Sequence, residues 1–334
     1  MPANLTPQFI RAREEYQKAS TPVEQLECLK RMMQLIPKHK GTDKLQGDIR
    51  RRVAEVKREL SAPKKQAKRG HSYKIPKEGG AQLVILGPPN AGKSQLLTHL
   101  TRANSEVAEY PFTTHLPIPG MMKFEDIQFQ LVDTPPITRD YMESWMLDVV
   151  RPADAALLML DLSQDDLLDH AEAITERLAK VRIHLVAQKP DFEDEEEARL
   201  TPEVYIPTLV LCNKVDLPDA PEQFEAVREL YDKEYTLLPV SAKDGKGIED
   251  FGKTVFDFCR VIRVYTKEPG RKPDFDQPYV LPIGATLLEA AAMVHKDFYD
   301  NLKYARIWGT GVHDGQSVKR DHVLSDKDLI ELHI

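Results

Sequence analysis

The segment Leu83–Ser94 combines residue types that can bind a phosphate group. An apolar run, Leu83–Leu86, is followed by the spacing Gly87-x4-Gly92-Lys93-Ser94, and a helical pattern resumes at Gln95. In a strand–loop–helix context, this spacing lets backbone N–H groups and a helix N-terminus surround an anion. We expect Lys93 to reach the β- and γ-phosphates and the Ser94 hydroxyl to bind Mg²⁺, whereas the alternative is a plain glycine turn. The predicted phosphate-contacting residues are Gly87, Pro88, Pro89, Asn90, Ala91, Gly92, Lys93, Ser94 and Gln95.

Three further polar motifs each follow a predicted strand, so they are expected to meet at one edge of a parallel sheet. Asp133 is a carboxylate suited to second-shell Mg²⁺ binding, as in a Walker-B aspartate. In Asn213-Lys214-x-Asp216, the Asp216 carboxylate can accept two N–H bonds from a guanine edge, and the Lys214 stem can pack over the base. Taken alone, this second motif could be a turn capped by Asp216. Together the motifs predict a guanine pocket formed by Asn213, Lys214, Asp216, Ser241, Ala242 and Lys243.

The segment 77–262 alternates apolar strand patterns with helical patterns, which is typical of βαβ units in a mostly parallel sheet. Its fold class is therefore α/β, with helices on both faces of the sheet. Helical spacing predicts helices at 93–102, 141–149, 167–179 and 247–259. The apolar runs predict strands at 83–86, 122–124, 127–132, 155–160, 181–186, 206–212 and 237–240.

Segments of a different character flank this α/β region. Residues 1–76 predict two helices within 4–36, a third at 42–60 and a basic linker. Residues 263–334 predict a small α+β module. Its predicted elements are a helix at 286–298 and strands at 261–266, 279–281, 304–308 and 330–333.

The net charge of −7 conceals one basic segment. Residues 38–77 carry 14 Lys and Arg against 4 Asp and Glu. For 44–77 this balance predicts contact with nucleic-acid phosphates, in particular those of RNA. A solvated helix face followed by a soluble linker is the alternative. The acidic stretch 191–197 is interpreted as a solvated surface loop.

The cysteines and the length of the apolar runs indicate in which cellular compartment the protein works. Three scattered cysteines (Cys28, Cys212 and Cys259) predict a reduced, cytoplasmic protein. The N-terminal residues lack the apolar core of a signal peptide. No run approaches the ~20 apolar residues that span a bilayer, so we expect no membrane association.

The order of the motifs resembles that of the translation-factor-like GTPases. The sequences GPPNAGKS, YPFTT, DTP, NKVD and SAK together are similar to the Obg family, and most similar to its developmentally regulated GTP-binding branch. The N-terminal helices around IPKHKGT resemble the helical start of that branch. Residues 263–334 resemble its C-terminal TGS domain, a β-grasp module. The resemblance covers nearly the whole chain and implies a P-loop GTPase fold.

The resemblance also implies roles for single residues and for partners. Thr114 would be the threonine that binds Mg²⁺ when GTP is present, with Thr113 as the rival choice. Lys93, Thr114 and Asp133 would then be the catalytic residues. Asn90 matches an asparagine of potassium-activated members, which implies K⁺ stimulation. The basic segment and the TGS-like module imply a ribosome or another RNA-bearing assembly as partner, with a partner protein also possible.

Three departures from the family pattern modify these expectations. Ile137 occupies the place where many GTPases carry a water-positioning glutamine, so intrinsic hydrolysis should be slow. Pro136 replaces a glycine whose N–H contacts the γ-phosphate in related enzymes, and proline has no N–H. Only 79 residues separate Asp133 from Asn213. The domain that this branch commonly carries there is therefore expected to be missing or much reduced.

Three functions stay open at this stage. The leading hypothesis is a GTPase that slowly hydrolyses GTP to GDP and acts as a nucleotide-dependent switch. The second is a binding module, a GTP-stabilised scaffold in which Pro136 has disabled hydrolysis. The third is a P-loop kinase acting on a small acceptor, which the guanine motif at 213–216 disfavours.

Overall fold

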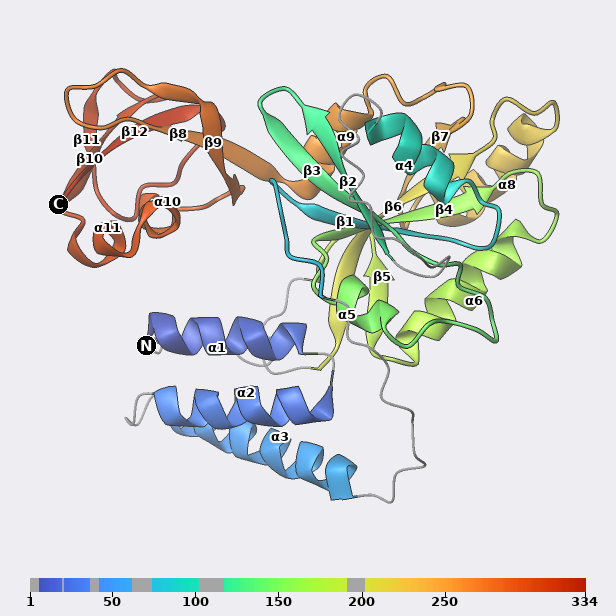
Figure 1. Ribbon diagram of the computed structural model, residues 1–334, viewed down its shortest axis with the longest axis horizontal. Coiled ribbons are helices and arrows are strands. Elements are labelled where there is room, and N and C mark those ends of the chain that lie inside the picture. The colour runs from blue at the N-terminus through green and yellow to red at the C-terminus, as the bar shows by residue number, and fades with distance from the viewer. Residues whose placement is uncertain (1–5, 20, 37–41, 62–73, 102–116, 191–201) are drawn as a thin grey trace.

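The computed structural model describes residues 6–19, 21–36, 42–61, 74–101, 117–190 and 202–334 (Figure 1). Within these ranges the chain forms a helical N-terminal region, a central α/β domain and a C-terminal α+β module. The predicted fold class is therefore confirmed. No helix in the described ranges combines the length and the apolar character needed to cross a membrane.

The N-terminal region consists of α1 (Pro7–Lys18), α2 (Pro22–Leu35) and α3 (Asp43–Ser61). The first two helices each begin with a threonine cap followed by proline, which fits the geometry of a first helical turn. Thr6 accepts a hydrogen bond from Phe9 N at 3.2 Å, and Thr21 forms a capping box with Glu24. The apolar faces share one small core made of Phe9, Ala12, Tyr16, Leu29, Met32, Ile36, Leu45, Ile49 and Val56.

The central sheet has the strand order β2-β3-β1-β4-β6-β5, and β7 also pairs with β6. All its pairings are parallel except β2 with β3. The long strand β6 pairs with β5 through its first half and with β7 through its second half. The strands are β1 (Gln82–Leu86), β2 (Ile118–Phe124), β3 (Ile127–Asp133), β4 (Ala155–Asp161), β5 (Ile183–Val186), β6 (Val204–Asn213) and β7 (Thr236–Val240).

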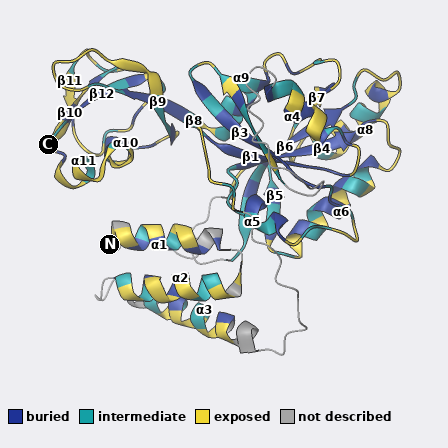
Figure 2. Ribbon diagram, in the orientation of Figure 1, coloured by how far each residue is buried: buried dark blue, intermediate teal, exposed yellow. Residues whose placement is uncertain are grey.

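Helices cover both faces of this sheet and bury a separate core on each side. One core contains residues of α5 (Met146–Val150), α6 (Leu167–Ala179) and α8 (Ala220–Tyr231). The other contains residues of α4 (Lys93–Thr101) and α9 (Phe251–Cys259). The central strands are consequently buried along their length, as Figure 2 shows for β1 and β4. This two-sided burial explains why their sequences are continuous apolar runs.

The register of the strands brings the predicted motifs to one edge of the sheet. Ile85 pairs with Asp133, and Asp161 pairs with Asn213. Asn213 in turn pairs with Val240, the residue before Ser241. The phosphate loop, Asp133 and the two base-binding motifs therefore meet at the carboxyl ends of neighbouring strands, as ligand sites do in open α/β sheets.

The C-terminal module is a second sheet with helices on one of its faces (Figure 1). Its strand order is β11-β10-β12-β8-β9, in which only β12 and β8 pair in parallel. Its elements are β8 (Val261–Thr266), β9 (Asp274–Pro282), α10 (Leu287–Val294), α11 (Lys296–Asn301), β10 (Tyr304–Trp308), β11 (Gln316–Val318) and β12 (Asp328–His333).

Some predicted elements differ from the structure. Helix α8 was not predicted, although Ala220, Phe224 and Val227 recur at helical spacing. The predicted helix 286–298 is wrong as one element. His295 ends α10 in an extended conformation and caps α11 with its ring.

Several predicted bounds also shift. The helix predicted at 141–149 shrinks to α5, and the one predicted at 247–259 shrinks to α9. Strand β9 is longer than the predicted 279–281, and β11 had not been predicted.

The segment between Asp133 and Asn213 was expected to lack an inserted domain. In its described parts, 134–190 and 202–212, the structure has only α5, β4, α6, β5 and β6, all of which belong to the central fold. The acidic stretch 191–197 lies outside the described residues.

Candidate nucleotide site

The phosphate loop connects β1 to α4 and contains a close contact that only glycine allows. Gly92 has a φ of +95°, and a Cβ at this position would lie 2.3 Å from Asn213 Nδ2. That amide group donates to Ala91 O at 2.7 Å. The glycine in the motif is therefore required both for its backbone conformation and for the approach of Asn213.

Lys93 is buried, with only 8% of the residue exposed, and its ammonium group lies inside the loop. Its Nζ donates to Pro88 O at 2.8 Å and to Gly87 O at 3.2 Å. Burial lowers the pKa of Lys93, and the nearby Asp133 carboxylate partly opposes this effect. A buried cation that is bonded to carbonyl oxygens and backed by a glycine loop is well placed to receive an anion.

Asp133 and Ser94 form the part of the site that fits Mg²⁺. Ser94 Oγ donates to Asp133 Oδ2 at 2.5 Å. The other carboxylate oxygen, Oδ1, is buried and has no hydrogen-bond partner among the described residues. Burial raises the pKa of Asp133, while the Ser94 hydroxyl and the Lys93 charge act against the rise. A hydroxyl oxygen and an unsatisfied carboxylate oxygen are the hard ligands that Mg²⁺ prefers.

Asn213 connects the phosphate end of the site to the base end. Besides donating to Ala91, its Oδ1 accepts a hydrogen bond from the Ala242 amide at 2.9 Å. Both the side chain and Ala242 are buried. One amide group therefore holds the loop after β1 at a fixed separation from the loop after β7.

Asp216 and Lys214 are held by hydrogen bonds from other loops. Ser241 Oγ donates to Asp216 Oδ1 at 2.7 Å, and this bond lowers the pKa of Asp216 and keeps the exposed carboxylate ionised. Lys214 has a φ of +72°, and its Nζ pairs with Asp161 Oδ2 at 2.5 Å. Asp161 had not been singled out from the sequence. Its position at the carboxyl end of β4 was the signal that could have identified it.

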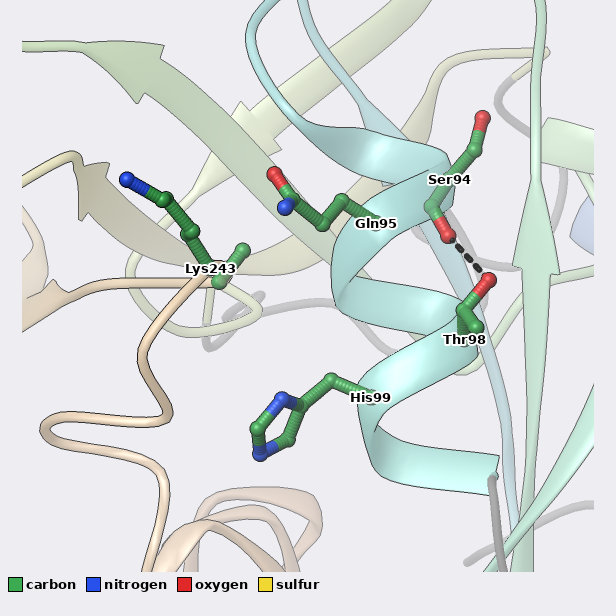
Figure 3. Close-up of a pocket in the computed structure, with 6 residues that line it drawn as sticks. Ser94, Gln95, Thr98, His99 and Lys243 are labelled. Carbon is green, nitrogen blue, oxygen red and sulfur yellow. Dashed lines mark hydrogen bonds between the residues drawn. The ribbon is translucent and has the colours of Figure 1, made fainter.

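A cavity of about 280 Å³ lies between α4 and the loop of Lys243 (Figure 3). In the figure, Gln95 and His99 project from α4 toward that loop, and Thr98 donates to Ser94 O at 2.8 Å. Thr98 and His99 were missed, although they follow Ser94 and Gln95 by one helical turn. The cavity is lined by Ser94, Gln95, Thr98, His99, Ala242 and Lys243.

Four further predicted residues lie in the phosphate loop. Pro88 and Ala91 are buried in it, whereas Pro89 and Asn90 are exposed at its tip. Asn90 has a φ of +60°. Thr113 and Thr114 lie outside the described residues, so their roles stay predictions.

The turn after Asp133 is held against the phosphate loop. Ile137 N donates to Gly87 O at 3.2 Å, and the Ile137 side chain is 1% exposed within the core that contains Val84 and Trp145. Pro136 before it is partly buried. The place expected for a water-positioning side chain is therefore occupied by a core residue.

The fold and this edge of the sheet define a P-loop GTPase. Residues 82–214 match the family model described as 50S ribosome-binding GTPase, and residues 262–334 match the TGS domain. The chain is 30% identical to an uncharacterized GTP-binding protein of Methanocaldococcus jannaschii, over 92% of each chain. It is 28% identical to the developmentally-regulated GTP-binding protein 1 of Xenopus laevis, over 88% of this chain and 94% of that one. The chain belongs to the developmentally regulated GTP-binding proteins of the Obg family.

The comparisons also give the length of one relative and the likeness to a solved structure. The alignment with the Methanocaldococcus protein covers 366 positions, more than the 334 residues of this chain, so that relative has residues without a counterpart here. Among solved structures, a GTP binding protein from Pyrococcus horikoshii OT3 aligns with a TM-score of 0.49 at 17% identity. That alignment covers 75% of this chain and 99% of that one.

Proposed function

We propose that this protein is a guanine-nucleotide switch that binds GTP with Mg²⁺ and hydrolyses it slowly to GDP and phosphate. The observation that carries the proposal is the bridge made by Asn213, which contacts Ala91 O at 2.7 Å and the Ala242 amide at 2.9 Å. Because this side chain joins the phosphate loop to the base loop, a single nucleotide can contact both.

Each residue of the site has a role in this proposal. Lys93 binds the β- and γ-phosphates, and Asp216 accepts N–H bonds from guanine. Lys214 covers one face of the base with its methylene stem while Asp161 holds its ammonium group. Ser94 and Asp133 hold Mg²⁺, which when bound neutralises phosphate charge.

Slow hydrolysis is proposed because the position in the turn after Asp133 where a water-orienting side chain is expected carries an isoleucine. Ile137 is packed in the core and Pro136 has no N–H. Potassium bound near the exposed Asn90, or a partner protein, would then supply the missing stabilisation of the transition state. Thr114 is the third residue of the protein that is proposed to hold Mg²⁺.

Nucleotide calorimetry and a single-turnover assay test the proposal together. We expect tight binding of GTP and GDP, weak binding of ATP, and slow phosphate release that is faster in KCl than in NaCl. Tight GTP binding without phosphate release would favour the second candidate, a GTP-stabilised scaffold, which the burial of Ile137 supports. ATP binding as tight as GTP binding would contradict the guanine assignment and favour a kinase.

The proposed partner is a ribosome or another RNA-bearing assembly, and a cytoplasmic location is part of this proposal. On α3, the side chains of Arg50, Arg51 and Lys57 are exposed and can contact phosphates. The remainder of the basic segment, 62–73, lies outside the described residues.

The uncovered face of the C-terminal sheet offers a second surface for RNA. Ala305 and Ile307 of β10 face the core, so Tyr304, Arg306 and Trp308 face the other side. The Tyr304 ring stacks on His333 at 4.5 Å, and Lys267 Nζ lies 4.3 Å from the centre of the Trp308 ring. Aromatic rings beside cations suit unpaired bases and their phosphates.

Sedimentation with ribosomes tests the partner. Binding is expected to be stronger with a non-hydrolysable GTP analogue than with GDP, and to weaken as salt rises. The double variant Arg50→Ala/Arg51→Ala should weaken it, whereas Glu222→Ala, on the distant α8, serves as control. Sedimentation that depends on neither nucleotide nor salt would contradict the switch and the electrostatic contact together.

A further inference from the structure

The turn that follows Asp133 has no backbone N–H available for a ligand from residue 135 to residue 138. Pro135 and Pro136 have no N–H at all. The Ile137 amide donates to Gly87 O at 3.2 Å, and the Thr138 amide donates to Tyr141 O at 2.9 Å. The turn lies against the phosphate loop, yet each backbone N–H from residue 135 to residue 138 is missing or already used.

The hydroxyl group at the start of the turn is also occupied. Thr134 Oγ1 donates to Ile85 O at 2.7 Å, and the residue is 4% exposed. The bond ties the turn to β1, the strand that leads into the phosphate loop. Thr134 is therefore fixed by the same sheet that fixes Gly87.

Ile137 anchors the turn from the opposite side. Its side chain is fully buried among Val84, Leu86 and Trp145, so a movement that released its amide would also expose apolar surface to water. The bond to Gly87 and this burial favour the same conformation. The turn is held by three independent attachments, which are the Thr134 hydroxyl, the Ile137 amide and the Ile137 side chain.

A ligand can change a conformation only through interactions that differ between two states. A γ-phosphate provides acceptor oxygens, and the backbone of residues 135–138 has no free N–H with which to meet them. We propose that residues 134–138 form a fixed wall of the phosphate pocket that does not respond to the γ-phosphate, and that Pro136 determines this property. This inference depends on the proposed function, since it requires that GTP and GDP bind in this pocket.

Hydrogen exchange on the full chain tests the fixed turn directly. With Mg²⁺ and either GDP or the imido analogue of GTP, peptides covering 134–141 should exchange equally slowly. Peptides covering 87–95 should become protected by both nucleotides, which reports binding. Protection of 134–141 that differs between the two nucleotides would overturn the inference. A phosphate loop that neither nucleotide protects would instead contradict the proposed function.

Two variants test the assignment to Pro136. Pro136→Ala and Pro136→Gly both introduce an N–H, and they differ in backbone flexibility. We expect both to bind the imido analogue about tenfold more tightly than the parent protein does, with GDP affinity unchanged, because a hydrogen bond to a charged group is gained only with the γ-phosphate.

A control separates this gain from the general effect of removing a proline. Pro119→Ala removes a proline from β2, opposite Val132 on β3, and should change neither affinity. The GDP affinity of each variant reports whether it folds. An unchanged affinity for the imido analogue in both Pro136 variants, with GDP binding intact, would overturn the role of Pro136.

Discussion

Arg263 Nη1 lies 2.8 Å from Asp126 Oδ1, and this ion pair joins the C-terminal module to the β2–β3 turn of the central domain. The same guanidinium pairs with Asp326 at 2.7 Å and with Glu125. These bonds, above all the one to Asp326, raise the pKa of Arg263, whose side chain is only 4% exposed. Strand β3 carries the turn at one end and Asp133 at the other. The C-terminal module therefore contacts the turn that leads into the strand of the proposed Mg²⁺ ligand.

Replacing Arg263 by alanine should destabilise the protein. The change leaves Asp126 and Asp326 without their buried partner, so we expect the free energy of unfolding to fall by about 3 kcal/mol in urea denaturation. Arg271→Ala is the matched control, because its side chain is 74% exposed and pairs with Glu268, three residues away on the surface. That variant should change stability by less than about 0.5 kcal/mol. Equal effects of both variants would argue against the importance of the interdomain cluster.

Lys93→Ala should weaken GTP and GDP binding by about 100-fold, because the variant loses charged hydrogen bonds to phosphate. Calorimetric titration measures the effect. Lys123→Ala, an exposed lysine of β2, is the control and should bind both nucleotides like the parent. Unchanged affinity in the Lys93 variant would mean that phosphate does not bind in this loop.

Asp216→Asn should shift the preference from guanosine toward xanthosine nucleotides. An asparagine replaces one acceptor oxygen by a donor, which suits the oxygen that xanthine carries in place of the guanine amino group. Competition between GTP and XTP measures the shift. Asp219→Asn, an exposed position three residues along, should retain the guanosine preference. A variant at Asp216 that still prefers GTP would contradict the base-recognition role.

Asp161→Asn should weaken the binding of GTP, GDP and ITP by the same factor, about tenfold. The buried carboxylate positions the Lys214 ammonium at 2.5 Å and accepts from Ser163 N at 2.9 Å. A lysine stem that packs on the base does not distinguish guanine from hypoxanthine, and it does not sense the number of phosphates. Asp165→Asn is the exposed control. A loss confined to GTP would place the effect at the phosphate end instead.

Asp133→Asn should stabilise the nucleotide-free protein at neutral pH while it weakens Mg²⁺-dependent GTP binding. Burial raises the folded-state pKa of Asp133 above the unfolded value, so the stability that this group contributes at low pH is lost as pH rises through that interval. The variant removes the buried charge. Urea denaturation at pH 7.5 should therefore show a gain that shrinks as the pH approaches about 4.

The exposed Asp140→Asn serves as the control for this pH experiment and should show no gain at either pH. A gain in the Asp133 variant that is the same at both pH values would point to altered packing rather than to the lost charge.

The sequence was sufficient to predict where its motifs would meet, because their residues are tied to strand ends. Ile85 and Asp133 are neighbours across β1 and β3, and a parallel sheet allows little freedom in where such residues go. The apolar runs around them were long enough to identify the strands. Gly92 was also predictable from its motif, and the structure gives the reason for the glycine, because the Asn213 side chain lies too close to where a Cβ would be.

The contacts that depend on packing between distant segments could not be predicted. Asp161 directly follows the predicted strand 155–160, but its ion pair with Lys214 became visible only when β4 and β6 were paired. The same holds for Arg263, whose partners Glu125 and Asp126 are more than 130 residues away. Ile137 was predicted only to leave water unpositioned. Its burial and the hydrogen bond from its amide to Gly87 O depend on how the core packs, so the sequence did not reveal them.

Asn213 connects two loops that the proposed site assigns to opposite ends of the ligand. In that assignment, its side chain sets how far the phosphates lie from the purine. A nucleotide analogue whose sugar is replaced by a longer or shorter linker would then match one end and miss the other. The proposed site would therefore select its ligand by length as well as by charge and by base.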